Sequence, residues 1–191
     1  MDDRRPARVR QPEPFSATWA WILSNPIATR HARRVVRLLG IRPGMRVLDV
    51  GCGTGRLSLP IAEVTGPSGE VVGLDVQRRM LEMLEHRAAA RGLRNIRTIH
   101  GEAGSTGLEP SSFDRALLVS VLGEIAPQQR DAALAEIAAA LRPGGLLAVA
   151  EGPPDPHRLS EEAVTILTQG AGLRPVRVDP VWLGFVLQAT H

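Results

Sequence analysis

The sequence predicts an α/β protein built on one doubly wound, Rossmann-like sheet of seven strands, mostly parallel with the last strand antiparallel. Short apolar runs alternate with helical patterns along most of the chain, as expected of parallel strands that helices cover on both faces. With 191 residues, the chain is long enough for one domain with a full core. The segment 47–55, VLDVGCGTG, joins an apolar run to alternating glycines, which is typical of a strand that enters a ligand-binding loop.

The composition is that of an ordinary globular protein and excludes several classes. Hydrophobic residues make up 43% of the chain, yet no apolar run reaches the length of a membrane span, so we expect no integral membrane association. The first residues lack the apolar stretch of a secretory signal. The single cysteine, Cys52, cannot form an internal disulfide. These features together favour a cytoplasmic protein.

Residues 1–14 are polar and contain three prolines, which predicts a disordered leader. All basic residues of the chain are arginines, and several lie between Arg4 and Arg10. An arm that contacts nucleic acid or a membrane surface stays open as an alternative. The net charge of the whole chain is only +3, so we expect no nucleic-acid partner.

Residues 15–40 are predicted to form a helical cover, and residues 41–191 the main domain. Between Thr29 and Leu39 the apolar residues recur at the spacing of one helix face. Trp19 and Trp21 precede this stretch and cannot share one helix face well. We therefore expect residues 15–30 to close over the ligand site as a lid, with burial of both tryptophans in the core as the alternative.

The first half of the sheet follows from apolar runs and the turns between them. We expect strands at 47–50, 70–75 and 96–100. A helix is expected from about Arg56, and Pro60 fits it only in the first turn. The turn 66–69, GPSG, ends this helix. The helix at 77–91 has its apolar residues on one face and stops at Gly92.

The second half repeats the pattern. We expect strands at 115–120, 146–150, 174–178 and 184–189. A helix with one apolar face begins near Pro127 and ends at the segment 142–145, RPGG. Ser160 is a suitable N-cap for a further helix that reaches Ala171.

Acidic residues follow the predicted strands at the edge where open α/β sheets bind ligands. Asp49 lies at the end of the first strand, Asp75 at the end of the second, and Glu102 after the third. A carboxylate at Asp75 can accept hydrogen bonds from both hydroxyls of a ribose, although the same residue can serve as a helix cap. The glycine spacing departs from the dinucleotide fingerprint because Arg56 stands where its last glycine belongs, and the absence of lysine excludes a P-loop.

The segment 49–55, D-x-G-x-G-x-G, together with Asp75 and the LRPGG segment at 141–145, resembles the class I S-adenosylmethionine (SAM)-dependent methyltransferases. The resemblance covers residues 41 to about 151. Within that family, the Trp-x-Trp segment and LDVGCGTG resemble the methyltransferases of ubiquinone and menaquinone biosynthesis and other small-molecule methyltransferases.

The resemblance implies SAM as the cofactor and assigns a set of binding residues. These are Asp49, Gly51, Cys52, Gly53, Gly55, Asp75, Val76, Met80, Glu102, Ala103 and Ser120. The glycines would carry the methionine part, with Asp49 near its amino group, and Asp75 would hold the ribose. Val76 and Met80 would pack on the adenine. Glu102, where the family more often has aspartate, would accept a hydrogen bond from the adenine amino group. Alternatives stay open: Met80 and Cys52 as core residues, and Glu102 as a solvated loop acid.

The expected function is transfer of the methyl group of SAM to a small molecule. Methyl transfer needs mainly positioning, and a general base only if the acceptor loses a proton. Glu124 is the candidate base, with His100 and His157 as weaker candidates. The chain has no [DNS]-P-P-[YFW] motif after the fourth predicted strand, so the signature of amino-group methylation of DNA and RNA is missing. Its single cysteine excludes the paired-cysteine mechanism of RNA cytosine-C5 enzymes.

We therefore expect a small, partly apolar acceptor and no metal site. The aromatic residues that could line its binding site are Phe15, Trp19, Trp21 and Trp182. Two rival functions stay open. One is a catalytically silent SAM-binding or interaction domain, because no base is certain. The other is a nicotinamide-dependent oxidoreductase, which Arg56 disfavours.

Overall fold

The computed structural model describes residues 35–152, 155–181 and 184–191. The predicted leader at 1–14, and the part of the predicted cover that precedes residue 35, lie outside these ranges, as does Trp182. Residues 35–38 are helical, and Val35, Val36 and Leu39 are buried in the core. The expected lid at 15–30 therefore stays a prediction.

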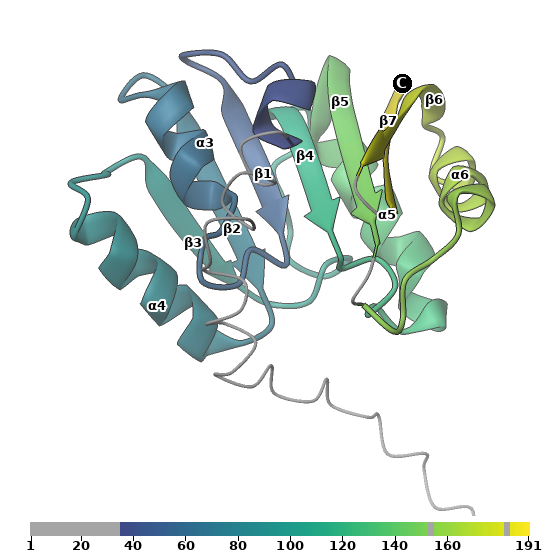
Figure 1. Cartoon of the computed structure of the whole chain (residues 1–191), viewed down its shortest axis with the longest axis horizontal. Coiled ribbons are helices and arrows are strands. Elements are labelled where there is room, and N and C mark those ends of the chain that lie inside the picture. Colours follow the sequence, from purple (N-terminus) through teal and green to yellow (C-terminus); the bar gives the residue numbers. More distant parts are fainter. Residues whose placement is uncertain (1–34, 153–154, 182–183) are drawn as a thin grey trace, which may run out of the picture.

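The described residues form one seven-stranded sheet with the order β3-β2-β1-β4-β5-β7-β6 (Figure 1). Its strands are β1 (Arg46–Val50), β2 (Glu70–Asp75), β3 (Ile96–His100), β4 (Phe113–Val119), β5 (Leu141–Glu151), β6 (Arg174–Val181) and β7 (Gly184–Thr190). The neighbouring pairs from β3 to β5 are parallel, and β7 runs antiparallel to both β5 and β6. This confirms the predicted architecture, including the antiparallel last strand.

The helices lie in two layers, one on each face of the sheet (Figure 1). On one face lie α3 (Ser58–Thr65) and α4 (Arg78–Ala89). On the other lie α5 (Arg130–Ala140), which follows a short 3-10 turn at Pro127–Gln129, and α6 (Glu161–Gly170). Each of these four helices follows a strand, as in the βαβ units of doubly wound sheets.

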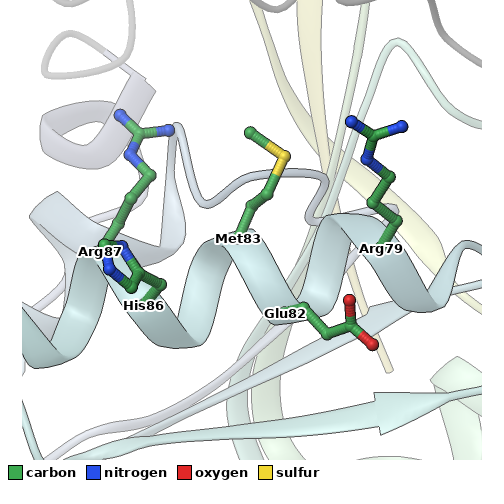
Figure 2. Close-up of a pocket in the computed structure, with 5 residues that line it drawn as sticks. All are labelled: Arg79, Glu82, Met83, His86 and Arg87. Carbon is green, nitrogen blue, oxygen red and sulfur yellow. The ribbon is translucent and has the colours of Figure 1, made fainter.

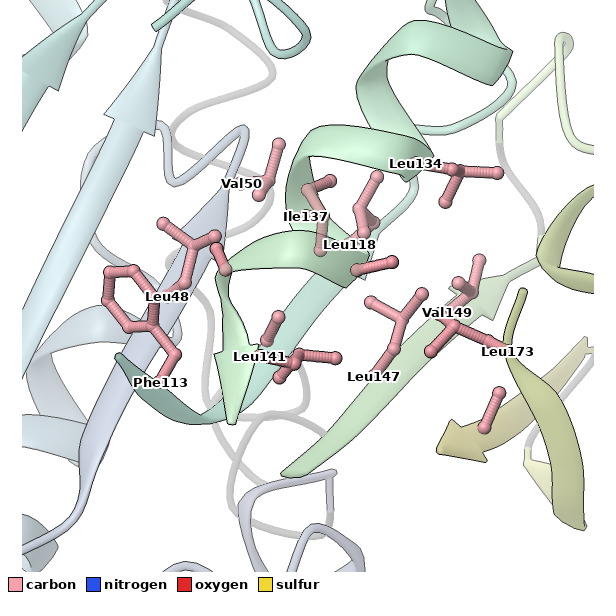
Figure 3. Close-up of a cluster of buried hydrophobic side chains, with 14 of the residues drawn as sticks. Leu48, Val50, Phe113, Leu118, Leu134, Ile137, Leu141, Leu147, Val149 and Leu173 are labelled. Carbon is pink, nitrogen blue, oxygen red and sulfur yellow. The ribbon is translucent and has the colours of Figure 1, made fainter. Parts of the chain in front are cut away.

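The core consists of aliphatic side chains on both sheet faces. Because side chains alternate along a strand, Leu48 packs toward α5 and α6 whereas Val47 packs toward α3. Figure 3 shows the first of these clusters, with Leu134 and Ile137 of α5 at one end and Phe113 beside Leu48 at the other. Full burial of each large side chain stabilises the fold by roughly 1.5–3 kcal/mol, so this packing fixes the strand ends that carry polar residues.

Several helix boundaries follow from local chemistry. α3 begins at Ser58, slightly later than expected, which places Pro60 in the first turn, where its missing N–H has no intrahelical partner to lose. The hydroxyl of Ser160 accepts a hydrogen bond from Ala163 N at 3.2 Å and caps α6 as predicted. β5 begins earlier than expected, because Leu141 already pairs with Phe113 across a register shift.

The strand order places a topological switch point beside β1. From β1 the chain moves outward to β2 and β3, and then returns to β4 on the other side of β1. Ligands of open α/β sheets bind where the strand order reverses in this way, outside the carboxyl ends of the strands. Among the residues that the structure describes, no helix has the length and apolar character needed to cross a bilayer.

Candidate functional site

The glycine loop, residues 51–57 between β1 and α3, lies at the switch point. The N–H groups of Gly51 and Cys52 donate to Leu74 O at 2.8 and 3.1 Å, which ties the loop to β2. Gly51 has φ +67 and no room for a side chain, because Val121 packs directly against it. Gly53 has φ +53 and faces open space. The loop is therefore closed toward β4 and open at its middle.

Asp75 lies at the end of β2, beside the open part of the loop, and its side chain is buried. One carboxylate oxygen accepts from Gly53 N at 2.8 Å and the other from Gln77 N at 2.8 Å. A carboxylate has about four acceptor positions, so each oxygen retains capacity for one more donor. Asp75 thus closes a short turn before α4, whose N-cap is Gln77 without a side-chain cap, so Asp75 is not itself the helix cap. Its contact with a ribose stays a prediction.

Asp49 is fully enclosed under the glycine loop. Its carboxylate accepts from the hydroxyl of Ser58 at 2.5 Å, which fastens the start of α3 to the end of β1. Burial raises the pKa of Asp49 to about 6; the hydrogen bond from Ser58 and the charge of Arg56 act in the opposite direction. Arg56 thus neighbours this acid, and its guanidinium pKa is lowered by burial. A contact between Asp49 and an amino group of a ligand stays a prediction.

The residues expected around an adenine occupy different environments. Val76 is 41% exposed, whereas Met80 is buried on the inner face of α4. Glu102 is exposed and accepts from the amide of Gln129 at 3.1 Å, while Ala103 packs against the core. His100 contacts the carbonyl of Val76 at 3.1 Å. Val76 and Glu102 thus face solvent at one side of the crevice, and their contacts with a ligand stay predictions.

Cys52 contributes its backbone to the loop and its side chain to the core. The thiol lies among Leu59, Leu81 and Leu84, and it approaches Gly73 so closely that a Cβ there would lie 2.9 Å from the sulfur. Burial raises the pKa of the thiol far above its ordinary value. The side chain is therefore a small apolar core residue rather than a nucleophile.

The loop after β4 borders the other side of the switch point. Ser120 adopts φ +55, an uncommon value for a residue with a side chain, and its N–H donates to Ala150 O at 2.8 Å. Arg130 braces the loop from α5 by donating to the carbonyls of Gly123 and Ile125, both at 2.9 Å. Glu124 is exposed on this loop. Partial desolvation and the nearby charge of Asp155 raise the pKa of Glu124 above its ordinary value, and His157 lowers it.

Two acids that the sequence did not single out lie near the same carboxyl ends of the strands. Glu136 of α5 accepts backbone N–H groups from the loop after β3, at Gly104 (2.6 Å), Thr106 (3.0 Å), Gly107 (2.7 Å) and Leu108 (3.3 Å). Glu151 lies buried at the end of β5 and accepts from Gly123 N at 3.3 Å. The sequence pattern could have indicated Glu151, because this acid ends an apolar strand just as Asp75 ends β2.

A separate surface pocket lies along α4 (Figure 2). It is lined by Arg79, Glu82, Met83, His86 and Arg87. Arg87 also donates to the carbonyl and the hydroxyl of Thr54, both at 2.8 Å, and so links α4 to the glycine loop. Of the described residues, those that line the pocket all belong to α4, and neither Asp75 nor a loop glycine is among them. It is therefore distinct from the strand-end site.

A family comparison identifies this combination of fold and loop. Residues 47–145, from β1 into β5, match the family model described as methyltransferase domain. The chain belongs to the methyltransferase domain family. The matched range contains the glycine loop, Asp75, Glu102 and the loop after β4, whereas Glu151 lies beyond it.

Known methyltransferases resemble this domain in sequence and structure. Nocamycin O-methyltransferase of Saccharothrix syringae is 37% identical over 150 residues, 78% of this chain and 52% of that protein. Demethylmenaquinone methyltransferase of Staphylococcus aureus is 34% identical over 119 residues, 62% of this chain and 48% of that protein. The chain thus spans about half the length of these relatives.

A solved SAM-dependent methyltransferase from Aquifex aeolicus has a TM-score of 0.80 and 25% identity, covering 92% of this chain and 98% of that one. The resemblance to class I SAM-dependent methyltransferases, and to those of quinone biosynthesis, is confirmed. Within the described residues, no three His, Cys, Asp or Glu side chains are placed to hold a metal ion.

Proposed function

We propose that the protein transfers a methyl group from SAM to a small-molecule acceptor. The observation that carries the proposal is the position of Asp75, a buried carboxylate hydrogen-bonded to Gly53 N of the glycine loop at the end of β2. This is where a nucleotide ribose meets an acid in doubly wound folds. The family match and the named relatives support the same reaction.

The residues present fit SAM as a ligand. Asp75 retains acceptor capacity for ribose hydroxyls, and open space over Gly53 lets a ligand approach the backbone. Exposed Val76 offers an apolar surface beside Asp75. The cofactor supplies a methyl group on a positively charged sulfur, which is already activated for transfer. The protein residues therefore have to bind, orient and exclude water rather than generate a reactive group.

We place the acceptor at the carboxyl ends of β4 and β5 and infer that it is partly apolar. Glu124 remains the candidate base, because it is exposed on the loop after β4 and its pKa is raised toward neutrality. The support for an apolar part comes from the relatives, one of which is named for demethylmenaquinone and another for nocamycin.

Two measurements on the purified protein test this function. Titration calorimetry with SAM and with S-adenosylhomocysteine should show stoichiometric binding of both. Incubation with SAM and a panel of quinols and phenols should then produce S-adenosylhomocysteine and a methylated product. Binding without turnover on any acceptor would support the catalytically silent alternative. Binding of a nicotinamide dinucleotide instead of SAM would support the oxidoreductase.

A further inference from the structure

Within the part of the chain that the structure describes, two buried carboxylate oxygens lack a hydrogen-bond partner at the carboxyl end of β5. They are Oε2 of Glu151 and Oδ2 of Asp155. The two residues are only 3% and 8% exposed. An acceptor atom buried without a donor costs roughly 1–3 kcal/mol, and more when the group is charged. Such atoms in a native structure indicate that a donor is missing.

The other oxygen of each side chain accepts a hydrogen bond from the backbone, and this bond holds the carboxylate in one orientation. Glu151 Oε1 accepts from Gly123 N at 3.3 Å, and Asp155 Oδ1 accepts from His157 N at 2.7 Å. The backbone of His157 packs closely against Gly123. The two acids are therefore held in place by the loops that follow β4 and β5.

The nearby arginines that could neutralise this pair bind elsewhere. Arg130 donates to the carbonyls of Gly123 and Ile125, both at 2.9 Å. Arg158 approaches the carbonyl of Asp155 at 3.5 Å rather than its carboxylate. Burial raises the pKa of Glu151 to about 7; the charges of Asp155 and Glu124 act in the same direction, and the backbone N–H groups of Gly123 and Leu159 act in the opposite one. We call Glu124, Glu151 and Asp155 the acidic cluster.

The acidic cluster adjoins the glycine loop through the loop after β4. Val121 packs on Gly51, and Gly123, two residues later, donates to Glu151. A ligand that extends from the glycine loop toward β5 would therefore approach the loop that covers these carboxylates. In the proposed reaction this is the acceptor side of the switch point.

We propose that Glu151 and Asp155 recognise an O–H or N–H group of the methyl acceptor, whose donor completes the hydrogen bonding of their free oxygens. The inference rests on the proposed function and adds a specificity: acceptors carry a hydroxyl or an amine near the transferred methyl. A donor that reaches these oxygens is itself removed from water, where a hydrogen bond to a carboxylate is strong. An acceptor in which that group is absent leaves both acids unpaired and binds poorly.

The test uses Glu151→Gln and Asp155→Asn, with Glu82→Gln as an exposed carboxylate control on α4. Each amide keeps the oxygen that accepts a backbone N–H and places an NH2 where the donor would bind. Calorimetry measures binding of matched probes to the protein saturated with S-adenosylhomocysteine. The hydroxyl arm compares catechol and hydroquinone with their dimethyl ethers, and the amine arm compares phenethylamine with propylbenzene.

We expect that, in one of the two arms, wild type binds the donor-bearing probe more tightly than its matched partner. Each amide variant should weaken the affinity for that donor-bearing probe about 10- to 100-fold. The ether or hydrocarbon, the control variant and the affinity for S-adenosylhomocysteine should not change. Equal binding of donor and ether, donor affinity unchanged in both variants, or binding of no donor-bearing probe would overturn the inference. Failure of wild type to bind S-adenosylhomocysteine would instead overturn the proposed function. If one variant does not fold, as judged by thermal unfolding, the other decides.

Discussion

The carboxylate of Asp75 accepts a hydrogen bond from Gly53 N at 2.8 Å, which fastens the end of β2 to the middle of the glycine loop. The second oxygen accepts from Gln77 N at the start of α4. One side chain thus holds the strand, the loop and the helix around the place proposed for the ribose. A change at Asp75 should therefore alter both the conformation of the glycine loop and the affinity for SAM.

Replacement of Asp75 by alanine should weaken SAM binding by about two to four orders of magnitude. The change removes two charge-assisted hydrogen bonds to the ribose, each worth roughly 1.5–3 kcal/mol, and every 1.4 kcal/mol corresponds to tenfold in affinity. It also leaves the N–H groups of Gly53 and Gln77 without acceptors, so the protein should unfold at lower temperature. Calorimetry on protein shown to be folded, with Glu82→Gln as control, measures the effect. Unchanged affinity would remove Asp75 from the binding site.

Replacement of Gly51 by alanine should destabilise the protein more than the same change at Gly53. Both glycines have positive φ, which costs a residue with a Cβ roughly 1–2 kcal/mol. At Gly51 the new methyl also collides with Val121, and overpacking of this kind costs typically about 1–3 kcal/mol more. Urea unfolding of both variants at one pH gives the difference.

The variant Gly51→Ala combined with Val121→Ala separates the two costs. Truncation of Val121 makes room for the methyl, so the double variant should recover the packing part of the loss but not the backbone part. Gly53→Ala with Val121→Ala should show no recovery, because Gly53 faces open space. If the free energies lost in Gly51→Ala and Val121→Ala simply add in the double variant, the methyl at residue 51 does not contact Val121.

The sequence predicts the strands of the sheet and the positions of Asp75 and the glycine loop because these follow from local patterns, whereas the antiparallel last strand goes with the resemblance to the methyltransferase family. Apolar runs, turn residues and strand ends are readable one segment at a time. The role of Glu136 is not readable in this way, because its partners at Gly104 to Leu108 are about thirty residues away and are backbone groups of any sequence. Glu151 could be expected as a strand-end acid, but its unpaired oxygen depends on how two loops pack.

The buried acid Asp49 should make the protein less stable as the pH rises from about 4 to 6. Its folded pKa is raised to about 6 from 3.8, so in this interval the folded protein retains a proton that the unfolded chain releases. The unfolded state then binds fewer protons, and the free energy of unfolding falls with pH.

Asp49→Asn removes this titration while its amide oxygen can still accept from Ser58. Relative to wild type, the variant should gain about 2–3 kcal/mol of stability between pH 4 and 7, at 1.36 kcal/mol per pKa unit. Urea unfolding of both proteins at several pH values measures the difference. A constant difference across the range would show that Asp49 titrates normally in the folded protein.

Glu136→Gln should loosen the loop after β3 and destabilise the protein by about 2 kcal/mol at neutral pH. The carboxylate accepts four backbone N–H groups, from Gly104, Thr106, Gly107 and Leu108, and an amide cannot replace a charge that all four donors share. Hydrogen exchange should become faster at these four amides in particular, because Gly104 N loses its acceptor and the other three then donate to one uncharged oxygen.

The pH dependence of this effect has the opposite sign to that of Asp49. Burial alone would raise the pKa of Glu136, but the hydrogen bonds from the loop outweigh it and lower the pKa. Its stabilisation is therefore present above the ordinary glutamate pKa of 4.5 and is lost as the pH falls through the lowered value. The gap between wild type and Glu136→Gln should shrink on acidification, whereas Asp131→Asn, an exposed acid on the same helix, should show no such gap. Exchange rates at residues 104–108 that equal those of wild type would exclude Glu136 as the residue that holds the loop.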